Sequence, residues 1–232
     1  MSSTLRKRRV LFFLILLVFF TFIIINNSPK SVEVNRPTSS ADKIATSPAK
    51  DALDKLIVKD GALQADYSRD KFGSGWLSVG GCDARNIILN RDLIDAAIND
   101  KCEVTSGKLN DPYTGKSINF TRGASTSGDI QIDHVVSLAD AWRTGAWQLT
   151  PNERLDLAND PLELLAVDGK ANMEKSDGDA SVWLPPNKPF RCQYVSRQIA
   201  VKQKYKLWVT SPEKDAIIGV LSKCPGQMLP SP

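Results

Sequence analysis

Two short apolar segments, the second followed by a turn and then a helix, most constrain what this chain can fold into. Residues 130–138 have an apolar strand pattern whose alternation breaks at Asp133-His134. Residues 162–167 form a second such run, Asp168-Gly169 is a turn sequence, and a helix is expected from Ala171 onward. The order strand, insertion, strand, helix predicts a ββα unit.

His134 is the only histidine among 232 residues, which makes it the candidate general base. An imidazole has an unperturbed pKa of about 6.5, which suits proton transfer near neutral pH. Adjacent strand residues point to opposite faces, so Asp133 and His134 can serve one site only where the strand ends or bulges. The alternative, an ordinary surface or core histidine, stays open. A single histidine excludes zinc centres built from several imidazoles and favours oxygen-bound magnesium, manganese or calcium.

Seven short motifs follow one another between residues 75 and 225. They are Cys82-Asp83-Ala84-Arg85-Asn86, Asp111-Pro112-Tyr113-Thr114-Gly115, Ile132-Asp133-His134-Val135-Val136, Ala139-Asp140-Ala141-Trp142, Asn159-Asp160-Pro161-Leu162, Ala171-Asn172 with Lys175 and Asp177, and Trp183-Leu184-Pro185-Pro186. In this order and spacing the chain resembles the HNH (His-Me finger, ββα-metal) nucleases, and more closely the HNH family related to the C-terminal domain of the GmrSD restriction enzymes. The resemblance implies an α+β domain with a ββα-metal core, added helices and a small hairpin.

The resemblance also implies a reaction, the metal-dependent hydrolysis of phosphodiester bonds in DNA or RNA. This chemistry needs an activated water and positive charge on the phosphate. His134 would take the proton of the water. Asp133 and Asn172 would hold one divalent ion, Mg²⁺ or alternatively Mn²⁺ or Ca²⁺, with water and substrate completing its coordination. Lys175, about one helical turn after Asn172, would face the same phosphate or be a solvated helix lysine. No zinc site is expected.

Two positions depart from the family pattern. Glu163 stands where the middle residue of H-N-H is asparagine, and Ser137 stands where a proline follows the Asp-His-Val-Val string. An ionised glutamate only accepts hydrogen bonds, so Glu163 would contact the metal or a water, or weaken the site. Near the phosphate it would slow cleavage by like-charge repulsion. The resemblance places Arg85 and Asn86 near the nucleic acid, and Lys170 is a further candidate for nucleic-acid binding because it is basic. The alternative for the first two is that they begin a helix beside a disulfide.

The N-terminal residues predict export. Four basic residues, 6–9, precede sixteen residues without a charge, 10–25, which together read as a signal peptide or signal anchor within residues 1–27. A Ser/Pro-rich flexible tether is expected over residues 28–50. The nuclease domain would then span residues 51–232, with its core at about 128–180. An uncleaved membrane anchor is preferred over full secretion, and either places the domain outside the cell.

The charge of the expected domain does not by itself indicate nucleic-acid binding. Residues 51–232 contain 22 basic and 24 acidic residues, so a nuclease needs its basic groups clustered. The candidates for such a cluster, most of them near an expected helix over residues 192–207, are Lys170, Lys175, Arg191, Arg197, Lys202, Lys204 and Lys206. The alternative is that they form a solvated helix face.

Four cysteines, all beyond residue 80, indicate an oxidising compartment. They allow three pairings, and because no two form a CxxC motif, a zinc ribbon is not expected. We favour Cys82 with Cys102 and Cys192 with Cys224, because the first pair brackets an expected helix over residues 91–99 and the second brackets helices over 192–207 and 212–222. Each bridge would contribute about 2–4 kcal/mol.

Other local signals complete the α+β prediction. Residues 150–153, Thr-Pro-Asn-Glu, form a capping-box sequence that opens a helix inside the ββα insertion. Ser211-Pro212 opens the last helix in the same way. Residues 103–109 and 117–120 are expected to form a hairpin around the turn at 111–115. Four tryptophans are expected to pack in the core rather than stack on bases: Trp142, Trp147, Trp183 and Trp208.

Three functions remain open from the sequence. The first is an exported or surface-tethered HNH endonuclease. The second is a non-catalytic nucleic-acid-binding or wall-binding module in which Glu163 marks the decay of the site. The third is a hydrolase of another phosphodiester. No obligate protein partner is indicated.

Overall fold

The two strands and the helix predicted around His134 lie between two hydrophobic clusters. The computed structural model describes residues 48–62 and 66–230. Strand β6 (Ile130–His134) pairs antiparallel with β7 (Leu164–Asp168), from Ile130 opposite Asp168 to His134 opposite Leu164, and α7 (Gly169–Lys175) follows at once. Alternate residues of β7 belong to different clusters. Leu165 and Val167 pack in the larger cluster, and Leu164 and Ala166 pack in the smaller one. The predicted order strand, insertion, strand, helix is confirmed.

Helix α7 begins directly at the end of β7, earlier than expected. The side chain of Asp168 caps it by accepting a hydrogen bond from the backbone N–H of Ala171 at 2.8 Å. Gly169 is needed at this junction, because a Cβ there would collide with the carbonyl oxygen of Gly128. The close approach fixes α7 against the start of β6.

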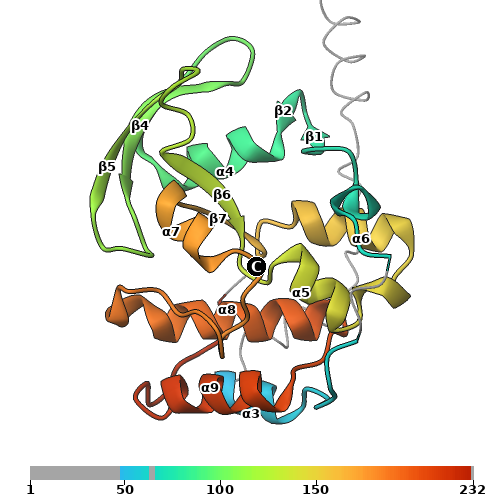
Figure 1. Ribbon diagram of the computed structural model, residues 1–232. Helices are drawn as coiled ribbons and strands as arrows, with labels where there is room; N and C mark the ends of the chain where they lie inside the picture. Colours follow the sequence, from blue (N-terminus) through green and yellow to red (C-terminus); the bar gives the residue numbers. More distant parts are fainter. Residues whose placement is uncertain (1–47, 63–65, 231–232) are drawn as a thin grey trace, which may run out of the picture. The chain divides into compact units, whose positions relative to one another are not determined.

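The insertion between β6 and β7 is helical. It contains α5 (Leu138–Arg143), the short 3-10 helix η2 (Ala146–Gln148) and α6 (Pro151–Asn159). The capping box that opens α6 is confirmed, since Thr150 and Glu153 exchange the two expected hydrogen bonds. A second 3-10 helix, η1 (Arg69–Phe72), packs against α6 and α5 (Figure 1).

A three-stranded antiparallel sheet stands beside this core. It has the order β3 (Ile94–Ile98), β4 (Val104–Asn110), β5 (Ser117–Thr121), and β4 with β5 confirms the predicted hairpin. The helix expected over residues 91–99 is wrong. Helix α4 (Ala84–Asp92) begins earlier, because the Asp83 side chain accepts a hydrogen bond from the Asn86 N–H at 2.7 Å. Residues 94–98 then pair with β4 as a strand.

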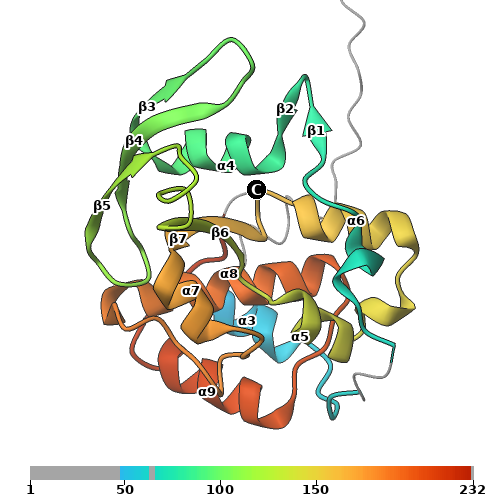
Figure 2. The same ribbon diagram turned by 45° about the horizontal axis from the view of Figure 1, so that its top comes forward.

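Three helices cover the opposite side of the β6–β7 ribbon from this sheet, as Figures 1 and 2 show. They are α3 (Ala49–Asp54), α8 (Arg191–Lys204) and α9 (Ser211–Leu221), and α3 packs against both others. Ala49, from the expected tether, is fully buried there. The remaining short elements are β1 (Ser78–Val79), β2 (Cys82–Asp83) and η3 (Lys188–Phe190). None of the helices within residues 48–62 and 66–230 is long and apolar enough to cross a membrane. The predicted leader and anchor lie outside the described residues.

Both predicted disulfides are present. Cys82 joins Cys102 with a Cα–Cα distance of 5.3 Å, and Cys192 joins Cys224 with a Cα–Cα distance of 6.0 Å. The first ties the start of α4 to the loop between β3 and β4, and the second ties the start of α8 to the segment after α9. Among the four tryptophans, Trp142 and Trp208 are buried and Trp183 packs against the main cluster. The core prediction is wrong for Trp147, which is 48% exposed at the short helix η2.

Candidate active site

His134 is a buried imidazole whose protonation state is fixed by its neighbours. It is 6% exposed at the end of β6, and its Nε2 lies 2.9 Å from the carbonyl oxygen of Ala158 on α6. A carbonyl only accepts hydrogen bonds, so Nε2 must carry the proton and Nδ1 keeps a lone pair. The Trp76 ring stacks on the imidazole, 5.7 Å between centroids and 7° between planes. Burial, reinforced by the charge of Arg69, lowers the pKa of His134 to about 3. At neutral pH the ring is therefore an uncharged base.

Asp133, the neighbour of His134, is held by two donors. The ammonium of Lys175 lies 2.9 Å from its Oδ1, and the hydroxyl of Tyr113 donates to its Oδ2. Burial raises the pKa of Asp133, while the Lys175 charge and the Tyr113 hydrogen bond oppose that rise. Lys175 also donates to the carbonyl oxygen of His134 at 2.8 Å. These bonds from Lys175 and Tyr113 fix the end of β6.

The expectation that Lys175 faces a phosphate or solvent is wrong. The residue is 1% exposed and its ammonium is used inside the protein. Tyr113 belongs to the motif at residues 111–115, but nothing in the sequence indicated that it would reach Asp133 from the turn between β4 and β5. Its partner lies twenty residues further along the chain.

One cavity of about 510 Å³ brings the predicted chemical residues together. Asp133, His134 and Asn172 all line it. The amide nitrogen of Asn172 donates to the side-chain oxygen of Gln131 at 2.8 Å, which leaves the amide oxygen of Asn172 as an acceptor. The lining also includes Arg69, Trp76 and Gln131, which the sequence did not single out as site residues.

The residues expected near nucleic acid have separate locations. Arg85 lines the cavity, and its Nη2 donates to the carbonyl oxygens of Ser127 and Ile130 at 3.1 and 3.2 Å. Asn86 is buried and accepts from the Val104 N–H at 2.9 Å, so it follows the helix-start alternative. Lys170 is exposed on α7, outside the cavity lining.

Glu163 braces the chain immediately after His134. It is fully buried, and its two carboxyl oxygens lie 3.2 and 3.3 Å from the backbone N–H of Val136. Its carbonyl oxygen accepts from the Val135 N–H at 2.9 Å. Burial raises the pKa of Glu163 well above its ordinary value. The expectation of a carboxylate beside the phosphate is therefore wrong, because Glu163 does not line the cavity.

Ser137, the second departure from the family pattern, begins a helix. Its hydroxyl oxygen accepts a hydrogen bond from the Asp140 N–H at 3.1 Å and so caps α5. The same hydroxyl donates to the carbonyl oxygen of Asp177 at 3.1 Å, just after α7. The serine thus connects the helical insertion to the helix that carries Asn172.

The cavity offers oxygen donors that suit a hard cation. Asp133 and Asn172 both belong to its lining. A carboxylate has about four acceptor positions, of which Lys175 and Tyr113 use two. Magnesium binds few protein ligands and keeps water and substrate oxygens for the rest, so this sparse set fits it. In the part of the chain that the structure describes, no three His, Cys, Asp or Glu side chains are grouped to hold a metal.

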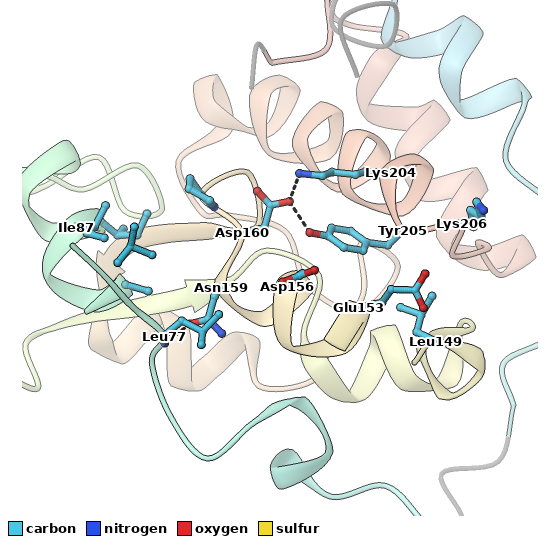
Figure 3. A pocket seen from close by; sticks show the side chains of 14 residues that line it. Leu77, Ile87, Leu149, Glu153, Asp156, Asn159, Asp160, Lys204, Tyr205 and Lys206 are labelled. Carbon is cyan, nitrogen blue, oxygen red and sulfur yellow. Dashed lines mark hydrogen bonds and ion pairs between the residues drawn. The ribbon is translucent and has the colours of Figure 1, made fainter. Parts of the chain in front are cut away.

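A larger cavity of about 690 Å³ lies beside α6, which contributes Glu153, Asp156 and Asn159 to its lining (Figure 3). Its walls include apolar Leu77 and Ile87, and its polar groups include the carboxylates of Glu153 and Asp156. Asp160 lies between Lys204 and Tyr205, with contacts of 2.6 and 2.8 Å. The apolar walls offer a phosphate no hydrogen bonds, and the three carboxylates outnumber the two lysines of the lining, Lys204 and Lys206, of which Lys204 is already paired with Asp160. The smaller cavity at His134 is therefore the better candidate.

The basic residues of α8 do not form the expected cluster for phosphate. Lys202 is buried between Asp140 and Glu213, at 3.0 and 2.7 Å. Arg197 donates to the carbonyl oxygen of Leu162 at 3.0 Å. These two cations hold α8 against its neighbours. They therefore form neither the expected phosphate-binding cluster nor a fully solvated helix face.

Comparisons with known proteins identify the family of the chain. The family described as GmrSD restriction endonucleases, C-terminal domain, matches residues 83–220. An uncharacterized secreted protein of Arthroderma benhamiae is 36% identical over 183 residues, which cover 78% of this chain and 86% of the relative. No solved structure matches. The chain belongs to the family of the GmrSD C-terminal domain, an HNH-type endonuclease domain.

Proposed function

We propose that the protein is an exported, metal-dependent endonuclease that hydrolyses the phosphodiester bonds of DNA. One observation carries the proposal: His134 is neutral, is oriented by Ala158, and shares a cavity with Asp133 and Asn172. Family membership supports a nuclease-related activity. The secreted relative and the two disulfides support export.

The residues of the cavity divide the work of phosphodiester hydrolysis. His134 accepts the proton of the attacking water at Nδ1, because Nε2 already donates to Ala158. Asp133 and Asn172 would hold the divalent cation, which when bound would supply positive charge to the phosphate and the leaving oxygen. Arg85 adds a fixed positive charge to the lining. Lys175 and Tyr113 position Asp133 and do not contact the substrate.

The decayed-site alternative loses its main argument. It rested on Glu163 as a mark of decay, and Glu163 instead supports the backbone that follows His134. No contact in the cavity favours a phosphodiester other than that of a nucleic acid.

The direct test is cleavage of supercoiled plasmid by the folded chain with Mg²⁺ and with EDTA. We expect cleavage only with the metal, and a loss of about 10²- to 10⁴-fold in rate for His134→Ala. Thermal unfolding of the same variant checks that the fold survives. Cleavage by His134→Ala at the wild-type rate, or full activity in EDTA, would contradict the proposal.

A further inference from the structure

A segment that precedes the family-matched region lies against the candidate active site. We call residues 66–77, which include η1, the strap; the family match begins at residue 83. The carbonyl oxygen of Lys71 accepts a hydrogen bond from Arg154 Nε on α6 at 2.9 Å. Phe72 is buried, with its ring 6.2 Å from that of Trp142. The strap is thereby fixed to α5 and α6, the helices of the insertion.

Gly73 shows how closely the strap follows α6. Its φ is +108°, and a Cβ there would collide with the side chain of Leu155. A residue with a side chain would be strained at this φ and would have to displace the Leu155 side chain. The position of the residues on either side is therefore set by direct packing.

Trp76, near the end of the strap, stacks on the His134 ring at 7° between planes. The next residue, Leu77, donates its N–H to the side-chain oxygen of Asn159 at 2.8 Å. Asn159 in turn follows Ala158, whose carbonyl oxygen orients the imidazole. The hydrogen bond from Leu77 to Asn159 therefore links the two groups that contact His134, Trp76 of the strap and Ala158 of α6.

Arg69, at the start of η1, lines the cavity beside His134. The residue is exposed, and within residues 48–62 and 66–230 its guanidinium forms no hydrogen bond or ion pair. The other cations near the site are used differently. Lys175 is buried against Asp133, and Arg85 gives one nitrogen to two carbonyl oxygens. Arg69 alone among these three keeps its whole planar fork of donors, which matches the geometry of a phosphate.

We propose that the strap completes the active site: Arg69 binds the phosphate that is cleaved, and Trp76 positions the His134 ring. The proposal rests on the proposed nuclease function. It assigns two working residues to a part of the chain outside the family match. Arg69 acts on the substrate directly, whereas Trp76 acts through His134.

The test of Arg69 compares Arg69→Gln and Arg69→Lys with Lys71→Gln. The control removes a positive charge from the same strap at a residue whose ammonium lies 4.8 Å from the Trp142 ring centre. With plasmid DNA and Mg²⁺, we expect Arg69→Gln to lose about 10- to 100-fold in kcat/KM, the value of one charged hydrogen-bonding contact. Arg69→Lys should recover part of the loss, because a lysine keeps the charge without the fork. Lys71→Gln should stay within about twofold of the wild type.

A binding measurement separates this proposal from the nuclease activity. The dissociation constant of a short DNA duplex is measured in His134→Ala, with and without Arg69→Gln, across a range of salt concentrations. Loss of one phosphate contact should weaken binding and reduce the slope of log Kd against log salt by about one. Equal affinity and slope in the two proteins would overturn the role of Arg69, even if the wild type cleaves DNA. If Arg69 contributes to salt-dependent binding but the wild type does not cleave DNA, the phosphate contact is supported and the proposed nuclease activity is contradicted.

Trp76 is tested by Trp76→Leu and Trp76→Phe. We expect Trp76→Leu to lower kcat about tenfold with KM within about twofold, because a misplaced base slows the chemical step more than binding. Trp76→Phe should restore most of the rate, since it keeps a flat ring against the imidazole. If Trp76→Leu matches the wild type in kcat, the positioning role is wrong. If Leu and Phe lose rate equally in proportion to a drop in melting temperature, Trp76 is a packing residue and the proposal fails for it.

Discussion

Asn172 gives the sharpest residue-level check on the metal. Asn172 lines the cavity, and because its amide nitrogen donates to Gln131, its amide oxygen remains an acceptor. We expect Asn172→Ala to lower the rate and to raise the Mg²⁺ concentration needed for half-maximal cleavage, because a ligand contributes both to ion affinity and to charge stabilisation. Asn172→Asp keeps an oxygen at this position and is the matched control. An unchanged Mg²⁺ requirement in Asn172→Ala would place the ion elsewhere.

Glu163 supports backbone that the reaction depends on. Its carboxyl oxygens accept from the Val136 N–H, two residues after His134. Glu163→Ala leaves that buried N–H without its partner, and we expect a loss of about 1–3 kcal/mol in the free energy of unfolding. Glu163→Gln keeps an accepting oxygen and should lose less. Urea unfolding of the two variants provides the comparison, and equal stability would show that the hydrogen bond to Val136 contributes little.

The sequence predicted which residues meet in the cavity better than it predicted their contacts. Asp133, His134 and Asn172 belong to motifs whose spacing indicated a ββα unit. Lys175 was misjudged because residues three apart on a helix differ by about 60° around the axis, enough to turn its side chain toward Asp133 instead of the cavity. The sequence did not indicate a role for Trp76 or Arg69, since they lie in a short, glycine-containing segment about sixty residues from His134. They come close to His134 only because that segment packs on α6.

At the scale of elements, the junction between β7 and α7 sets the place of Asn172. A Cβ at Gly169 would collide with the Gly128 carbonyl oxygen at the start of β6. We expect Gly169→Ala to lower the free energy of unfolding by about 1–3 kcal/mol through overpacking, and to reduce the rate of DNA cleavage by displacing α7.

Gly219 in α9 is the matched control, because a Cβ there would meet nothing within 4 Å. Gly219→Ala should leave stability unchanged or raise it by about 0.5–1 kcal/mol, as alanine is favoured inside a helix. Thermal or urea unfolding of both variants gives the comparison. Similar stability changes at the two glycines would mean that the β7–α7 junction can relax.

Elements with a strong local signal were predictable, and those decided by packing were not. The capping box of Thr150 and Glu153 located α6 correctly. Residues 94–98, Ile-Asp-Ala-Ala-Ile, have apolar residues four apart that suit a helix as well as a strand. Their conformation was decided by pairing with β4 after the Asp83 cap had placed α4 earlier in the chain.

At the scale of the whole molecule, one buried charge group links α5, α8 and α9. Lys202 pairs with Asp140 and Glu213. Burial, aided by the nearby charge of Asp140 and opposed by Lys202, raises the pKa of Glu213 from 4.5 to about 7. The folded protein therefore binds a proton here at pH values where the unfolded chain does not. This proton contributes stability below the unfolded pKa, and the contribution is lost as pH rises through about 7.

The variant Glu213→Gln tests this dependence. Its amide cannot ionise but keeps an oxygen that can accept from Lys202. We expect the stability of the wild type relative to Glu213→Gln to fall as pH rises from about 5 to about 8, measured by urea unfolding at several pH values. A difference that stays constant with pH would show that Glu213 ionises normally in the folded protein.

The pairing of Pro48 with Met228 brings the two ends of the described domain together. The Ala49 N–H donates to the carbonyl oxygen of Gln227 at 2.8 Å beside this bridge. A domain whose ends are adjacent can be inserted into a surface loop of another protein, or circularly permuted, without stretching the host or the guest. The fold is therefore suited to insertion into a host protein, with both connections made at the Pro48–Met228 bridge.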